Sequence, residues 1–230
     1  MQDSQQPANT IEALVYKASL KQDVYQKTYD TFQQFKRLIK EIVDTNKAGV
    51  KAANPKIAFS YEDQGEFEIT LKFGGDVLIF LMHTNIFEFP RDHEVMKTTY
   101  IKDSPNRSYC GMITIFNFLA DSFNYNRLSD VGYMIGRIFI NKDLHYFIEG
   151  KREIGMLYNN FQTAVITHES VRQLIESAML YTLNFDLLTP PYENMKEVSV
   201  AEIQSVLENL PMRTGKRLGY RFTADTDPGN

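Results

Sequence analysis

The sequence contains little cysteine and little histidine, the side chains that most often hold zinc. Its one cysteine, Cys110, excludes an internal disulfide and a cysteine-based zinc site. The four histidines stand at positions 83, 93, 145 and 168, without HxH or HxxxH spacing. His83, Glu88 and His93 fall across a strand end and a turn, which favours ordinary polar roles over a metal cluster. From this pattern we expect no resident cofactor.

Long apolar runs and an excess of positive charge are absent too. No apolar run approaches the roughly 18 to 20 residues that cross a bilayer, and "MQDSQQPANT" lacks the order of a signal peptide. The net charge of −4 gives no general reason to expect a nucleic-acid partner. We expect a cytoplasmic protein with no membrane contact.

Apolar residues are plentiful enough for a full core. Hydrophobic residues make up 43% of the 230 residues and aromatic residues 13%, which is typical of one large globular domain. We expect a disordered leader over residues 1–9, a single domain over 10–223 and a flexible tail over 224–230.

The first predicted element is a helix over residues 10–47. Its apolar residues recur at steps of three and four: Ile11, Leu14, Ala18, Tyr25, Phe32, Phe35, Ile39 and Ile42. Lys21 and Thr28 interrupt this stripe, which argues against a regular coiled coil. Two interpretations remain: the helix lies across its own domain's sheet, or it also pairs with a second subunit to form a homodimer.

The middle of the chain, residues 56–166, has the alternation of strands. In "EFEITLKF" apolar and polar residues alternate completely, and Gly74-Gly75 then supplies a tight turn. Strands are predicted over 66–73, 76–89, near 96–102, over 108–119, in a hairpin over 133–151 and within 156–166, with a polar loop over 122–130. Short turns between them favour antiparallel pairing.

The last third returns to helix. Thr167 caps a predicted helix over 167–183, and Ser199 with Glu202 forms a capping box for another over 199–210. Strands in the middle with helices at the ends predict an α+β fold. We expect a mainly antiparallel sheet of about six to eight strands, one long N-terminal helix and two C-terminal helices.

Glu149-Gly150-Lys151 matches the strand-borne Glu-x-Lys pair of metal-dependent nucleases. On a strand Glu149 and Lys151 share a face, where a carboxylate binds Mg²⁺ and an ammonium orients a water. The chemistry requires a second carboxylate, and Asp121 is the candidate that the sequence offers. The three residues together define a candidate catalytic site.

The hairpin geometry favours a simpler explanation. With Asn141-Lys142-Asp143 as the turn, Glu149 lies opposite Ile135, and Arg137 lies diagonal to Glu149. An ordinary ion pair with Arg137 then accounts for the Glu149 charge. The same register places Met134 on the core face of the hairpin and Ile135 on the other face.

Two further features bear on partners. A basic group near the C-terminus is a candidate contact for an acidic partner, or a solvated tail: Arg213, Lys216, Arg217 and Arg221. Aromatic residues on the predicted strands line a groove for a small apolar ligand or a partner's helix, or simply pack beneath the N-terminal helix.

The favoured hypothesis is a non-catalytic protein- or ligand-binding module, homodimeric through its first helix. The alternative is a metal-dependent nuclease or phosphodiesterase that uses Mg²⁺ with Glu149, Lys151 and Asp121.

Overall fold

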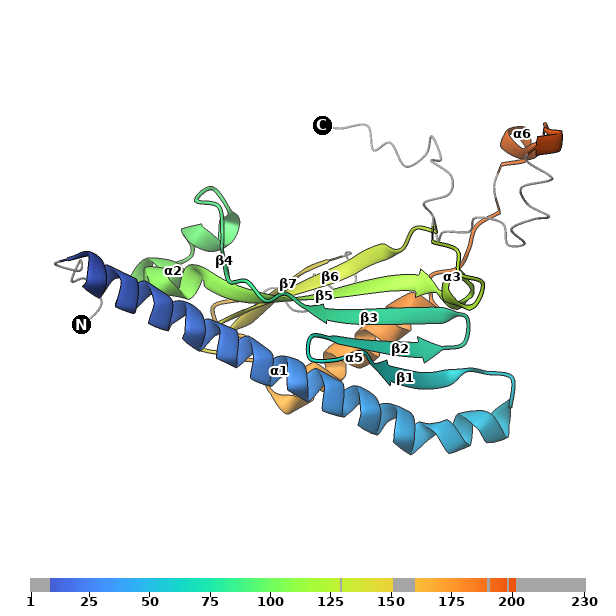
Figure 1. Cartoon of the computed structure of the whole chain (residues 1–230), viewed down its shortest axis with the longest axis horizontal. Coiled ribbons are helices and arrows are strands. Elements are labelled where there is room, and N and C mark those ends of the chain that lie inside the picture. Colours follow the sequence, from blue (N-terminus) through green and yellow to red (C-terminus); the bar gives the residue numbers. More distant parts are fainter. Residues whose placement is uncertain (1–8, 129, 151–159, 190, 198, 202–230) are drawn as a thin grey trace.

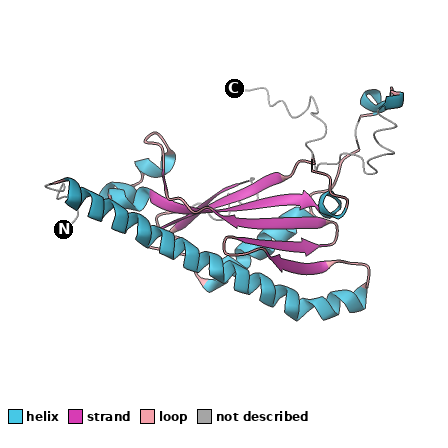
Figure 2. Ribbon diagram, in the orientation of Figure 1, coloured by secondary structure: helices cyan, strands magenta, loops and turns pink. Residues whose placement is uncertain are grey.

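The structure, a computed structural model, describes residues 9–128, 130–150, 160–189, 191–197 and 199–201. Two long helices, α1 (Thr10–Ala53) and α5 (His168–Leu183), pack against one antiparallel sheet (Figures 1 and 2). Its strands are β1 (Phe59–Asp63), β2 (Glu68–Phe73), β3 (Asp76–Met82), β4 (Phe87–Glu88), β5 (Tyr109–Leu119), β6 (Tyr133–Asn141) and β7 (Tyr146–Gly150). The predicted α+β class is confirmed.

The strands lie in the order β1-β2-β3-β5-β6-β7, and β4 extends the β3 side by pairing with β5. Every pairing is antiparallel. Short turns join β1 to β2, β2 to β3 and β6 to β7, whereas residues 83–108 with their short helices join β3 to β5. The tightest connection is the β2–β3 turn, where Gly74 has a φ of +56° that glycine adopts without strain. The seven-stranded sheet agrees with the six to eight strands predicted.

One face of the sheet packs against both α1 and α5. In β2 and β3 the alternating residues on this face, such as Leu71 and Phe80, are fully buried, as the period of two requires. Helix α1 adds Phe32, Phe35 and Ile39, while α5 adds a second apolar stripe: Val171, Leu174, Ile175 and Ala178. This face holds the main core.

The opposite face carries a smaller, aromatic cluster: Phe89, Tyr100, Ile101, Cys110, Phe139, Phe147 and Phe161. Two short helices cover it, η1 (Glu94–Lys97) and α2 (Thr99–Asp103), followed by η2 (Pro105–Ser108). The strand predicted near 96–102 is therefore wrong. Adjacent Tyr100 and Ile101 are both buried in this cluster, whereas a strand would place them on opposite faces.

The predicted hairpin register is also wrong, by two residues. Glu149 pairs with Arg137, not Ile135, because the turn runs over residues 142–144 and the Asn141 N–H donates to the His145 carbonyl at 3.0 Å. Leu144 closes this turn with a φ of +61°. The parity is unchanged, so Glu149 and Arg137 still share a face.

A bulge in the pairing of β5 with β6 overturns one further prediction. The register shifts between Ile115 and Phe116, so Ile135 is the extra residue in β6. Ile135 therefore turns toward the helices and is 2% exposed, while Met134, predicted on the core face, is 46% exposed.

The remaining elements agree more closely with the sequence. Helix α1 continues six residues past the predicted end at Lys47, and Thr167 caps α5 as expected. One helical turn, α3 (Ala120–Asn124), overlaps the predicted polar loop, and α6 (Tyr192–Met195) was not predicted. Outside the described residues lie leader residues 1–8, the strand segment 156–159, the second C-terminal helix from 202 onward and the tail 224–230. Within the described part of the chain, no helix is long and apolar enough to cross a membrane.

Candidate functional site

Glu149, the centre of the predicted nuclease site, lies on β7 between two basic side chains. The Arg137 guanidinium on β6 donates to one carboxylate oxygen, forming an ion pair. The His93 Nε2 atom lies 3.2 Å from the other oxygen. Both Glu149 oxygens therefore have a partner, as the ion-pair interpretation expects. Lys151 lies outside the described residues.

Asp121 is not brought close to Glu149. It lies in α3, beyond the far end of β5, whereas Glu149 is aligned through Arg137 with Thr114 of β5. The seven residues from Thr114 to Asp121 correspond to about 20 Å along a strand. Nor does any group of three or more His, Cys, Asp or Glu residues suited to a metal ion occur within the described ranges. The two carboxylates do not form one metal site.

The other candidate metal ligands have separate polar partners. His83 accepts the Asn85 N–H through Nδ1 at 3.0 Å, and Glu88 accepts the Tyr109 hydroxyl at 2.8 Å. His93 accepts the Val95 N–H through Nδ1, so its Nε2 atom carries the proton that it donates to Glu149. These are the ordinary polar roles that the spacing predicted.

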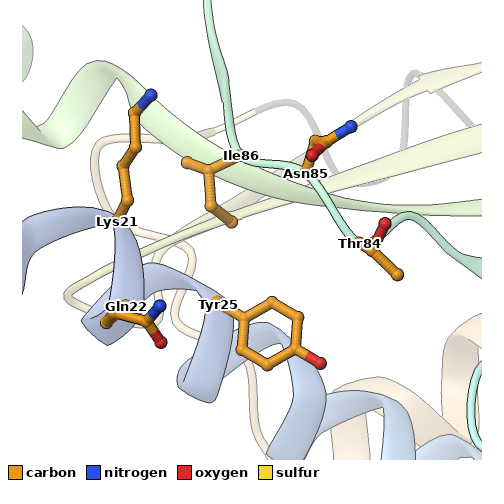
Figure 3. Close-up of a pocket in the computed structure, with 6 residues that line it drawn as sticks. All are labelled: Lys21, Gln22, Tyr25, Thr84, Asn85 and Ile86. Carbon is orange, nitrogen blue, oxygen red and sulfur yellow. The ribbon is translucent and has the colours of Figure 1, made fainter. Parts of the chain in front are cut away.

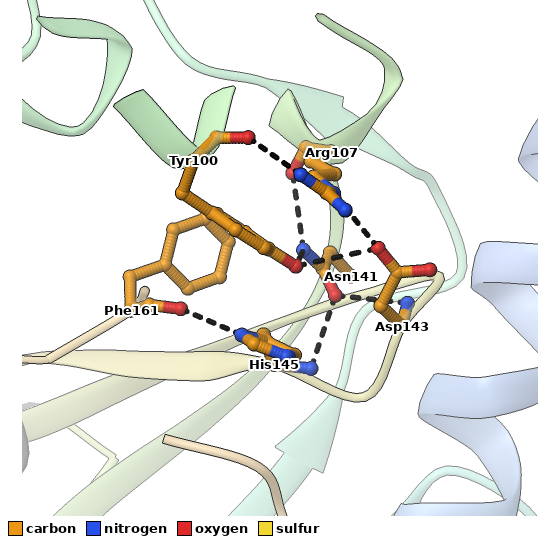
Figure 4. A network of polar contacts seen from close by, with 6 residues as sticks. All are labelled: Tyr100, Arg107, Asn141, Asp143, His145 and Phe161. Carbon is orange, nitrogen blue, oxygen red and sulfur yellow. Dashed lines mark hydrogen bonds and ion pairs between the residues drawn. The ribbon is translucent and has the colours of Figure 1, made fainter. Parts of the chain in front are cut away.

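A polar network that the sequence analysis missed lies at the β6–β7 turn (Figure 4). Asn141 is fully buried, and its amide oxygen accepts the N–H groups of Asp143 and His145 at 3.0 Å each. The Asn141 NH₂ group donates to the Tyr100 hydroxyl at 3.0 Å and to the Arg107 carbonyl at 3.3 Å. Two of the four bonds satisfy N–H groups at the turn, and the other two join Asn141 to α2 and η2, so the network holds the turn against these short helices.

Two groups with reactive side chains are made inert by their surroundings. Burial raises the pKa of the Cys110 thiol well above its ordinary value, which removes the thiolate that a nucleophile or metal ligand requires. Burial likewise raises the pKa of Tyr100, whose ring stacks on His145 at 4.6 Å between ring centroids. Cys110 therefore acts as a packing residue, and Tyr100 combines packing with its hydrogen bond to Asn141.

Three of the strand aromatic residues, Phe80, Phe139 and Phe147, are buried in packed clusters. On the helix side, Phe80 packs against Phe35 with ring centroids 5.9 Å apart. On the other side, Phe139 stacks on Phe147 at 5.1 Å, and Phe161 packs edge-on against the latter. Phe80 thus packs beneath α1, as the packing interpretation predicts, whereas Phe139 and Phe147 pack on the opposite face of the sheet.

The N-terminal end of α1 has the most exposed apolar residues of that helix. We name residues 10–19 the α1 arm; Leu20 is the first buried residue of the helix. On the arm Ile11 is 67% exposed, Leu14 61% and Val15 58%. In Figure 1 the arm extends past the ends of the strands. Two polar contacts tie it to the domain: Tyr16 with Asn106, and Lys17 with Tyr109.

Beside the arm lies a pocket of about 380 Å³ (Figure 3). Helix α1 contributes Lys21, Gln22 and Tyr25, and the segment between β3 and β4 contributes Thr84, Asn85 and Ile86. The sequence analysis missed it because residues 84–86 were assigned to one continuous strand over 76–89. Because β3 ends at Met82, residues 84–86 are not paired with β2, and the pocket lies between them and α1.

The basic residues near the C-terminus, Arg213, Lys216, Arg217 and Arg221, lie outside the described residues. Comparison with known proteins assigns no family: no family model, curated protein or solved structure matches the chain. Any functional conclusion therefore depends on the geometry given above.

Proposed function

We propose that this chain is a non-catalytic binding module that associates with a second copy of itself through the α1 arm. The observation that carries the proposal is the exposure of Ile11, Leu14 and Val15 on a fully formed helix. Burying one such side chain contributes about 1.5–3 kcal/mol, so covering this stripe provides a substantial driving force for association.

Among the described residues, none of the three core clusters includes Ile11, Leu14 or Val15. The polar contacts of Tyr16 and Lys17 and the buried Leu20 and Val24 are what attach the start of α1 to the domain. Neighbouring apolar residues on one exposed face indicate a surface that another molecule covers. The exposed part of the stripe is limited to the arm. Lys21 interrupts the stripe just beyond the arm, and Thr28 further along is buried against Gly111 of the sheet.

Sedimentation equilibrium of the full chain tests this proposal. We expect the native protein to be a dimer at micromolar concentration and the double variant Ile11→Asp/Leu14→Asp to be a monomer with an unchanged helical circular dichroism spectrum. Leu128→Asp is the matched control, because Leu128 is apolar and 89% exposed but lies far along the chain from α1. A native protein that sediments as a monomer, or a double variant that stays dimeric, contradicts the proposal.

The nuclease alternative has its own assay. We expect the native chain and Glu149→Ala to be equally inactive on single- and double-stranded DNA and RNA with Mg²⁺ or Mn²⁺. The reason is that Glu149 is already engaged by Arg137 and His93, while Asp121 lies in α3, beyond the end of β5. Metal-dependent cleavage that disappears in Glu149→Ala would establish the enzyme instead.

A further inference from the structure

We propose that the pocket lined by Lys21, Gln22, Tyr25, Thr84, Asn85 and Ile86 binds a carboxylate attached to a flat apolar group, supplied by a small free acid or by the C-terminal residue of a peptide. The site is separate from the α1 arm, and the inference does not depend on self-association through it.

The charge of the lining points to an anion. Lys21 is the only charged residue among the six, and no carboxylate accompanies it. Gln22 and Asn85 add amide N–H donors and Thr84 adds a hydroxyl. Hydrogen bonds between an ammonium or amide donor and a carboxylate are about twice as strong as neutral ones, so such a lining selects a carboxylate over an uncharged amide.

The apolar part of the ligand has a defined place as well. The Tyr25 ring and the Ile86 side chain lie on opposite sides of the pocket, with Lys21 along its margin (Figure 3). A flat group between them contacts a ring face on one side and methyl groups on the other. Ligand pockets commonly combine such apolar walls with a few polar groups that fix orientation.

The walls are held in place without a ligand. Tyr25 stacks on Tyr29 with ring centroids 6.2 Å apart, and Tyr29 packs edge-on against Phe67 at 6.3 Å. Across the pocket, Ile86 packs against the small core cluster of Leu20, Val24 and Tyr109. The Asn85 N–H donates to His83 Nδ1 at 3.0 Å, which fixes the backbone of the segment. The apolar walls are therefore preformed, and ordering them costs little conformational entropy on binding, while the polar side chains of Lys21, Gln22, Thr84 and Asn85 are exposed to solvent.

The experiment is an amide NMR titration of the full chain with phenylacetate, and in parallel with phenylacetamide. We expect saturable shifts of the amides of residues 21–25 and 84–86 with phenylacetate, and binding about tenfold weaker with phenylacetamide. The second arm compares a short peptide that ends in phenylalanine and a free carboxylate with its C-terminal amide. Tighter binding of the peptide acid than of phenylacetate identifies a protein C-terminus as the source; the reverse identifies a free acid.

Variants separate the pocket from the rest of the chain. Lys21→Gln should weaken phenylacetate about tenfold, while Lys27→Gln, an exposed lysine on the same helix outside the lining, should leave binding unchanged. The monomeric Ile11→Asp/Leu14→Asp variant should bind as the native chain does, so loss of self-association leaves this inference standing. Absence of shifts at these residues, equal binding of acid and amide, or an unaffected Lys21→Gln variant overturns it.

Discussion

The two parts of α1 share one apolar periodicity but have different surroundings. From Thr28 to Val43 the apolar stripe is buried against the sheet and α5, whereas on the arm it faces solvent. The difference arises where the sheet ends, not from a change in the helix. Periodicity therefore establishes which residues share a face, while coverage of that face depends on distant parts of the chain.

The largest expected effect separates the two parts directly. Phe35→Ala should lower the free energy of unfolding by about 3–5 kcal/mol, because it empties a fully buried site beneath the helix. Leu14→Ala should change it by less than about 0.5 kcal/mol in dilute protein, because Leu14 contributes to no described core cluster. Urea unfolding of both variants measures the contrast. Similar losses in the two variants would mean that the arm belongs to the folding core.

A smaller effect is expected at Gly111, where the buried part of α1 lies closest to the sheet. Gly111 of β5 lies under Thr28, and a Cβ at Gly111 would overlap the threonine side chain. Gly111→Ala should therefore destabilise the protein by about 1–3 kcal/mol.

A double-mutant cycle tests the assignment to Thr28. Thr28→Ala removes two of the three overlapping atoms, so the combined variant should lose about 0.5–2 kcal/mol less than the sum of the single changes. If the losses of the two single variants simply add in the double variant, the strain of Gly111→Ala does not come from contact with Thr28.

The smallest of these effects concerns the ion pairs of Lys36 and Lys40 on α1 with Asp63 on β1. Hydrogen bonds from Lys36 and Lys40 lower the pKa of Asp63 from 3.8 to about 2. Because the folded-state pKa is lowered, the stabilisation is present above the unfolded pKa of about 3.9 and is lost as pH falls toward 2. Asp63→Asn should cost about 1 kcal/mol at neutral pH, allowing for solvent screening, and only a small part of that at pH 2, where the folded-state carboxyl is half protonated.

Unfolding free energies measured between pH 2 and pH 7 test this dependence. Glu62→Gln, an exposed neighbour on the same strand, is the control and should leave the native pH profile unchanged. A pH-independent difference between Asp63→Asn and the native chain would show that the two lysines do not act through the carboxylate charge.

The sequence was informative where local rules decide the structure. Alternation predicted β2, Gly74-Gly75 predicted its turn, and Thr167 predicted the start of α5. It failed where a single backbone position changes the pattern. Leu144 in a left-handed conformation shifted the hairpin register by two residues. The bulge at Ile135 buried Ile135 on the core face and left Met134 exposed.

For the candidate sites too, the local contact was predictable from the sequence and the non-local one was not. Parity along two strands was enough to place Arg137 beside Glu149, since a register error of two residues preserves the face. The pocket was not predictable in this way, because it joins α1 to residues 84–86, about sixty positions away, through a break in a strand. Such non-local contacts have no signature in a local apolar pattern.

One property of α1 affects anything that binds its arm. The helix runs for 44 residues without a proline, about 66 Å, and its middle turns, from Leu20 to Val43, are anchored to the domain. A molecule attached to the arm is therefore carried on a stiff rod, not on a flexible tether. Its orientation relative to the sheet is set before binding, so two joined copies would present their sheets at one fixed spacing and angle.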